Sequence, residues 1–254
     1  MAGQRDDFTQ HFSSQFNKEL ENLRNRVLAM GAVVEQQIAD AVTALETGNA
    51  NMARAVIGGD LHVNALEVYL DEECGRILAR RQPAAGDLRL VFAVIKTVTD
   101  IERIGDSAKG VARMAIKMIE AAPQRSVLKL QPLGDLVREM VHQALSAFAH
   151  LDVNLALQVE RADIPADLEY QSIMRRLTTQ MTEEPGTINW ALHLVWAARA
   201  LERAGDHAKN ISEYLIYMVQ GKDVRHVSIE DRERQVQDRA SLSSGEANEP
   251  SRKT

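Results

Sequence analysis

Residues 101–109 read IERIGDSAK and residues 201–209 read LERAGDHAK, so one motif occurs twice in this chain. Glu, Arg, Gly, Asp, Ala and Lys recur in the same order and with the same spacing. On a helix, Glu-x-x-x-Asp places two carboxylates one turn apart on one face, where like charges repel. A repulsive pattern that occurs twice indicates a cationic counterpart, either a metal ion or a basic side chain from a neighbouring helix.

Apolar residues around both motifs follow a helical period. Between residues 8 and 45 they recur every three or four positions without a break, which predicts one long helix. Further helices are expected at 60–81, at 87–121, at 133–151, at 166–182 and up to Gln220, with short segments ending near Gly58 and Val159. No segment alternates with the period of two that is typical of a strand. The expected fold class is all-α.

The two halves of the chain present their helices in the same order. Each half has a long helix, a short segment, a helix with an acidic start, a turn containing proline and then a motif helix; Asp60 corresponds to Asp163. This order predicts two tandem, pseudo-symmetric three-helix bundles with six long helices. The expected boundaries are 8–122 and 126–221 for the bundles and 222–254 for a polar, mobile C-terminal tail.

The overall composition excludes several classes of protein. A net charge of −6 argues against a nucleic-acid partner. The single cysteine, Cys74, excludes an intramolecular disulfide and fits a reducing compartment. The N-terminus is polar and lacks the apolar core of a signal peptide, and the longest apolar stretch, 190–198, is too short to span a bilayer. We therefore expect a soluble, cytoplasmic protein that is not embedded in a membrane.

Acidic side chains around the motifs form candidate metal sites. The two motif carboxylates lie about 40° apart around each helix, and the helix before each motif helix carries the same four-residue acidic step. Antiparallel neighbours could face two carboxylates with two more, and four oxygen donors suit a hard or borderline cation such as Mg²⁺, Mn²⁺ or iron. The candidate ligands are Glu102, Asp106, Glu202, Asp206, Glu67, Asp71, Asp163 and Asp167.

A solvated charged face with local ion pairs, for example between Asp106 and Lys109, is the competing interpretation of these acids. The duplication weighs against that interpretation without excluding it. Gly105 and Gly205 each cost about 1 kcal/mol relative to alanine in mid-helix, which predicts close helix approach beside the carboxylates. An inherited packing contact accounts for the two glycines equally well.

Three segments resemble the PhoU family of bacterial phosphate-signalling regulators: RQPAAGDLR at 81–89, DIERIGD at 100–106 and ALERAGDHAKNI at 200–211. The resemblance extends over roughly residues 10 to 227. It implies two three-helix bundles whose acidic motifs carry a divalent metal or iron (Mg, Mn, Fe or Zn) on the bundle surface. By this match Glu102, Asp106, Glu202 and Asp206 are the first candidates, and the four acids of the preceding helices come second. The sequence departs from the repeat at Gly110, where the second motif has Asn210.

The same resemblance implies a function. Members of the family act as negative regulators of the phosphate regulon. They are thought to link the ATPase of the Pst phosphate transporter to the PhoR sensor histidine kinase, near the inner membrane, and they are frequently dimers. We therefore expect a non-enzymatic, homodimeric adaptor with metal-binding acidic motifs.

Two alternatives remain open on the residues alone. A carboxylate-bridged di-iron oxidase needs paired Glu-x-x-His steps inside a bundle, and the chain offers only Glu139-x-x-His142, without a repeat partner. A metal-free adaptor would use its acidic faces to dock basic surfaces of its partners.

Overall fold

The computed structural model describes residues 3–121, 128–221, 227, 230–232 and 234. The expected linker after residue 122 and most of the expected tail at 222–254 lie outside these residues. In chain order the helices are α1 (Gly3–Thr47), α2 (Ala50–Arg81), α3 (Ala85–Glu120), α4 (Gln131–His150), α5 (Val153–Glu183), the 3-10 turn η1 (Pro185–Thr187) and α6 (Ile188–Gln220). The described part of the chain contains no strand, which confirms the all-α prediction.

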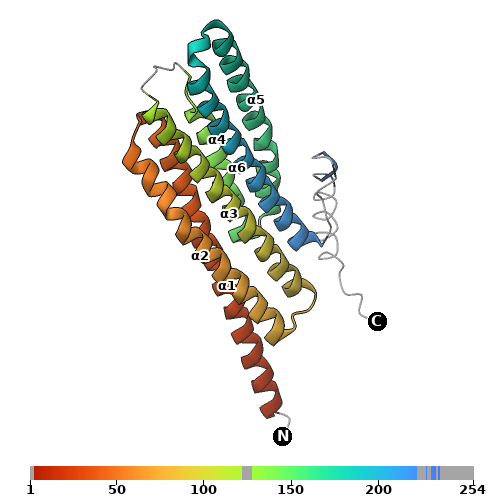
Figure 1. The fold of residues 1–254 in the computed structure, drawn as a ribbon. Helices are drawn as coiled ribbons and strands as arrows, with labels where there is room; N and C mark the ends of the chain where they lie inside the picture. Colours follow the sequence, from red (N-terminus) through yellow and green to blue (C-terminus); the bar gives the residue numbers. More distant parts are fainter. Residues whose placement is uncertain (1–2, 122–127, 222–226, 228–229, 233, 235–254) are drawn as a thin grey trace.

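The helices form two three-helix bundles that lie side by side (Figure 1). Helices α1, α2 and α3 make the first bundle, and α4, α5 and α6 make the second. Between the bundles α3 packs on α6 and α1 packs on α4, whereas α2 and α5 contact only their own bundle among the described helices. The two motif helices are therefore central, and the acidic helices α2 and α5 flank them. None of the described helices has an apolar stretch long enough to cross a membrane.

Helix α2 is continuous, so the predicted break at Gly58-Gly59 is wrong. Its buried residues Val56, Asp60 and Val63 keep a helical spacing across the glycines. A Cβ atom at Gly59 would lie 2.9 Å from Nε2 of Gln37 on α1. Close approach between α1 and α2, rather than a turn, thus explains the glycine.

Helix α5 is also continuous, although the sequence predicted a separate helix from about residue 166. Proline inside a helix removes one backbone donor and normally marks a boundary, yet α5 runs through Pro165. Apolar residues on both sides of it, including Val159, Ala166 and Ile173, are buried in the same bundle. Because these residues are buried in the bundle, the segment stays helical through Pro165.

Capping residues confirm the correspondence between the halves. Asn49 Oδ1 accepts a hydrogen bond from the Met52 amide at the start of α2. Asp152 Oδ1 accepts from the amides of Asn154 and Leu155 at the start of α5. Both side chains satisfy backbone donors that the first helical turn leaves without partners.

Glycines bring α1 and α4 together between the bundles. A Cβ atom at Gly31 of α1 would lie 2.4 Å from a methyl group of Leu145, and one at Gly134 of α4 would lie 2.8 Å from Val42. Glu46 of α1 also accepts a hydrogen bond of 2.6 Å from the Leu130 amide, just before α4. These contacts fix α4 on α1.

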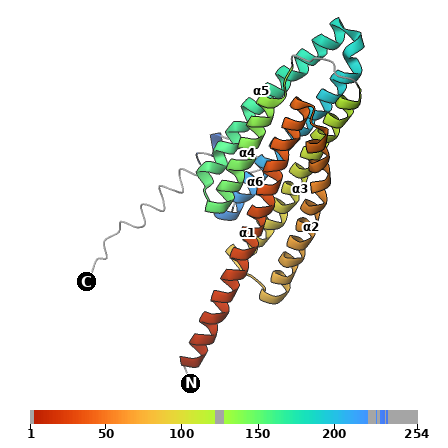
Figure 2. The ribbon, with the colours of Figure 1, turned by 90° about the vertical axis from the view of Figure 1, so that its left-hand side faces the viewer.

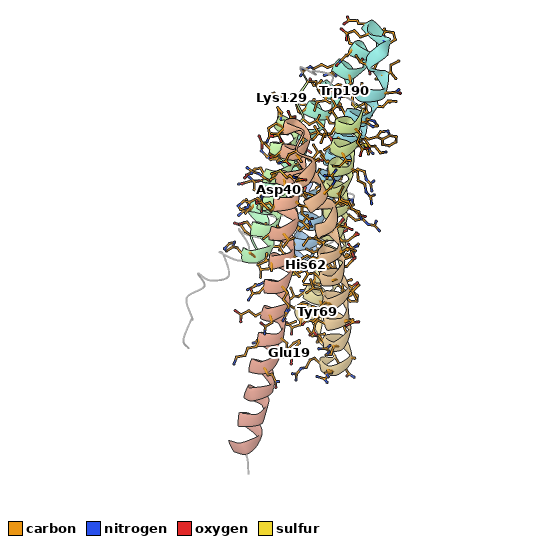
Figure 3. All side chains as sticks on the ribbon, turned by 60° about the vertical axis from the view of Figure 1, so that its left-hand side comes forward. Glu19, Asp40, His62, Tyr69, Lys129 and Trp190 are labelled. Carbon is orange, nitrogen blue, oxygen red and sulfur yellow. The ribbon has the colours of Figure 1, made fainter. Side chains whose placement is uncertain are left out.

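Helix α1 extends past the α2–α3 end of the first bundle (Figure 2). Near that end the carboxylate of Glu19 pairs with the guanidinium of Arg81, at the end of α2, at 2.6 Å. Glu19 lies toward the end from which α1 projects, and Trp190, near the start of α6, lies toward the other end (Figure 3).

Candidate functional site

The motif lysines make one equivalent ion pair in each bundle. Lys109 Nζ donates to Oδ2 of Asp60 at 2.5 Å, and Lys209 Nζ donates to Oδ2 of Asp163 at 2.6 Å. Both aspartates are buried. The pairs tie α2 to α3 and α5 to α6, so a basic side chain from a neighbouring helix is the cationic counterpart of these two acids.

The structure brings the acids of α2 and α3 together as a first acidic patch, which comprises Glu67, Asp71, Glu102 and Asp106. Burial raises the pKa of Glu67, and the charges of Asp71 and Asp106 raise it further. Burial likewise raises the pKa of Glu102, with additional repulsion from Asp106 and Glu67. Glu67 of α2 and Glu102 of α3 are therefore close enough for the charge of one to affect the other.

A second acidic patch comprises Asp163, Asp167, Glu202 and Asp206, on α5 and α6. Burial raises the pKa of Glu202, and Asp206 and Asp167 add to this increase. Burial also raises the pKa of Asp206, followed by the charges of Asp163 and Asp167. Asp163 is the member already neutralised, because it accepts the hydrogen bond from Lys209.

Arginines of the motif helices partly balance both patches. Arg103 lies 3.6 Å from Glu102 and 3.9 Å from Asp106. Arg199 pairs with Glu202 one turn along α6. The guanidinium side chains are about half exposed, so each pair contributes little stability and can exchange its partner.

The patches fit a hard cation by donor type and charge. Glu202 Oε2 is buried without a hydrogen-bond partner, and so is Oδ1 of Asn64, which follows Asp60 by one turn of α2. Such orphaned oxygens are those that a cation can satisfy. As the side chains stand, no three His, Cys, Asp or Glu residues of the described chain converge on a single point. Side-chain rotation would therefore accompany ion binding.

The Glu139-x-x-His142 step lies on the outside of α4. Glu139 accepts a hydrogen bond from Gln143, and the His142 ring, whose side chain is 61% exposed, faces Glu35 of α1. These groups do not project into a bundle interior, where the di-iron interpretation needs them.

The sequence profile of the PhoU domain matches residues 27–115 and 130–215, which are the two bundles. The chain belongs to the PhoU family. A "phosphate-specific transport system accessory protein PhoU homolog" from Pseudomonas putida is 47% identical over 97% of this chain and 96% of its own length. The protein with the same description from Pseudomonas aeruginosa is 48% identical over 89% of this chain and 93% of its own.

Solved structures of the family agree with the fold. The crystal structure of PhoU from Pseudomonas aeruginosa superposes with a TM-score of 0.79, at 48% identity, and covers 82% of this chain and 100% of its own. The family resemblance and the helical-bundle fold expected from the motifs are both confirmed.

The PhoU repeat is asymmetric where α3 meets α6. His207 Nδ1 lies 2.6 Å from Oδ1 of the buried Asp100, and Asn210 Nδ2 donates to the same oxygen at 3.2 Å. The equivalent positions in the other half are Ala200, Ser107 and Gly110. The contact between His207 and Asp100 was not anticipated from the sequence, because the two residues belong to different bundles.

A second polar cluster of this PhoU protein was also missed. Arg232, beyond the end of α6, is 5% exposed and lies 2.7 Å from Glu160 of α5 and 2.9 Å from Glu213 of α6. Glu160 and Glu213 are themselves buried, which their places in the sequence do not indicate. No local pattern around Arg232 connects it to them.

Proposed function

We propose that this protein regulates phosphate transport as an accessory component of a phosphate-specific transport system. The observation that carries the proposal is family membership over both bundles, together with relatives of nearly the same length that bear that description. The surface acids of both bundles are its candidate working parts.

We further propose that the protein is a non-enzymatic adaptor and a negative regulator of the phosphate regulon. It would act in the cytoplasm, near the inner membrane and as a homodimer, to link the Pst transporter ATPase to a PhoR-type sensor kinase. Two acidic patches, one on each bundle, support two-sided binding because each could engage a different basic surface.

A pull-down from phosphate-replete cells tests the adaptor. Wild-type protein should recover both the ATPase and the kinase, and the pair Glu102→Gln with Asp106→Asn or the pair Glu202→Gln with Asp206→Asn should each lower recovery of one partner. The matched control is Glu183→Gln with Glu184→Gln, which removes two exposed acids at the end of α5. Equal recovery by wild type and both patch variants would refute a role for the patches.

We propose in addition that the patches bind a divalent metal or iron. Glu102 and Asp106 with Glu67 and Asp71 would hold an ion in the first bundle. In the second bundle Glu202, Asp206 and Asp167 would do so, with Asp163 available if Lys209 releases it. A bound ion supplies positive charge that offsets the carboxylate repulsion, and it cross-links two helices of one bundle.

Metal analysis of protein purified without chelators tests this part. Wild type should carry metal, and Glu202→Gln with Asp206→Asn should lose about half of it while the helical content stays unchanged. The control variant Glu183→Gln with Glu184→Gln should retain it. If wild-type protein carries no metal above background, the proposed metal binding is wrong, and the adaptor function is unaffected.

The metal-free adaptor remains the second candidate because no three ligand-type residues converge in the described structure. In that case the patches dock basic partner surfaces directly. Partner binding would then weaken strongly with salt and would not respond to chelator. A loss of binding on chelation would favour the metal instead.

A further inference from the structure

A groove of about 410 Å³ lies on the surface between α3 and α6. Its wall contains four arginines, two from each motif helix, and Asp106 is its single acid. We call this feature the arginine groove. The residues used below are Arg103, Arg113, Arg199, Arg203, Trp196 and Gly110.

The groove exists because the repeat is asymmetric. At the equivalent surface of the repeat, His207 and Asn210 both contact Oδ1 of Asp100, and the Lys96 ammonium lies 5.1 Å from the Tyr214 ring centre. On the groove side the small residues Ala200, Ser107 and Gly110 replace Asp100, His207 and Asn210, and Trp196 takes the place of Lys96. A Cβ atom at Gly110 would lie 3.5 Å from that of Ala200, so the two helices are close beneath the groove.

The groove is positively charged, and two of its four arginines pair with no described residue. Arg113 and Arg203 make no hydrogen bond or ion pair with any residue that the structure describes, and both are exposed. Arg103 and Arg199 contact the acidic patches on either side through exposed, weak pairs. Guanidinium groups bind phosphate with two parallel hydrogen bonds, which makes such a convergence a phosphate-type site.

Trp196 provides an aromatic face at the same place. Its side chain is 63% exposed, whereas Trp190, the other tryptophan of the chain, is 6% exposed. Planar bases stack on exposed aromatic rings at about 1–3 kcal/mol per base. An arginine cluster beside an open indole therefore combines the two elements that recognise a phosphate attached to a planar ring.

We propose that the arginine groove binds a nucleoside phosphate, with the phosphate on Arg113 and Arg203 and the base against Trp196. The volume lies in the range of about 300–1,000 Å³ typical of small-molecule sites. The lined stretch of α3, from Arg103 to Met114, is roughly 16 Å long at helical rise, a length that suits one nucleotide. This inference is independent of the proposed adaptor function and of any metal.

The test is titration of the full chain with ADP in EDTA, which excludes binding through a metal at the acidic patches. Calorimetry on wild type should show binding. Trp190→Phe leaves Trp196 as the only tryptophan of the chain. The fluorescence of Trp196 should change as ADP is added, and this change should give the same dissociation constant as calorimetry. Inorganic phosphate should bind more weakly than ADP and should leave the Trp196 fluorescence unchanged.

Paired variants locate the phosphate. Arg113→Gln with Arg203→Gln should weaken ADP binding about tenfold or more. This is the loss in affinity expected when one or two charge-assisted hydrogen bonds are removed. Arg175→Gln with Arg176→Gln removes the same charge from exposed positions on α5 and should change the affinity less than about twofold.

Four outcomes would overturn the proposal. Wild type that gives neither heat nor a fluorescence change at millimolar ADP has no such site. Equal affinity for phosphate and ADP would exclude a role for the base. Unchanged ADP affinity in the Arg113 and Arg203 variant would place the nucleotide elsewhere. Retention of an acidic peptide by this surface, with no response to ADP, would assign the groove to a protein partner instead.

Discussion

Arg232 Nη1 lies 2.7 Å from Oε1 of Glu160 inside the second bundle. The Glu160 side chain is fully buried, and Arg232 also pairs with Glu213 at 2.9 Å. Burial raises the pKa of Glu160 in spite of the arginine, so desolvation outweighs the attraction at this carboxylate. Arg232 thus pairs with two acids from different helices and holds its own position against α5 and α6.

Arg232→Ala should destabilise the protein by about 3–5 kcal/mol, because removal of one partner leaves buried charge without compensation. Urea unfolding followed by circular dichroism measures this change. Arg234→Ala is the control, since the Arg234 side chain is 74% exposed and, among the described residues, pairs with Asp231 one turn away. Equal midpoints for the two variants would show that the buried cluster does not stabilise the second bundle.

Lys109→Met should cost about 1–3 kcal/mol, because it leaves the buried Asp60 carboxylate without its donor. The hydrogen bond that Lys109 donates to Asp60 raises the pKa of Lys109, so the pair favours the charged lysine. Lys209→Met should cost less, since Lys209 is 31% exposed and water can replace part of its contact. Thermal unfolding measures both variants. Lys117→Met, an exposed position on α3, is the control, and a loss of equal size there would contradict the argument.

The fold was predictable because its signals are local. The period of the apolar residues fixed the helical segments, and the repeated motif fixed the two-bundle arrangement. The errors at Gly59 and near Pro165 share one cause. Glycine and proline are judged from sequence as breakers, but here contact with Gln37 and burial around Ile173 hold the helices continuous. Tertiary contacts of this kind leave no local signature.

The acidic patches were predictable for the same reason, since a four-residue step on a helix fixes a shared face. The basic and polar groups that pair with these acids were harder to predict from the sequence. The alignment of Asp60 with Asp163 was visible, but the lysines that bind them come from another helix. Asp100 with His207 and the arginine groove depend on how α3 meets α6, which the spacing of residues along one helix does not determine.

Cys74 should be inert in the folded protein. Burial raises the pKa of its thiol to about 12, and the charges of Asp71 and Glu73 add to the effect, so the reactive thiolate is scarce at neutral pH. A thiol reagent such as Ellman's reagent should label native protein far more slowly than protein in denaturant. Rapid stoichiometric labelling without denaturant would show that α2 opens away from the first bundle.

In the metal-free protein, the acidic patches should make the free energy of unfolding increase as the pH falls. Burial and neighbouring acids raise the pKa of Glu67, Glu102 and Glu202 above the ordinary value of 4.5. The folded state therefore binds protons that the unfolded state has lost, so these groups make the free energy of unfolding rise as the pH falls through the raised pKa values. Their contribution levels off below 4.5, where both states are protonated.

Glu102→Gln isolates this effect, because glutamine keeps the shape of the side chain and cannot ionise. In EDTA the variant should be more stable than wild type at neutral pH, and the difference should shrink as the pH falls through the raised pKa of Glu102. Urea midpoints at a series of pH values measure the difference. Excess Mn²⁺ should reverse its sign at neutral pH, since a bound cation stabilises the ionised carboxylate of wild type. A variant less stable than wild type in EDTA at neutral pH would show that Arg103 outweighs the repulsion from Asp106 and Glu67.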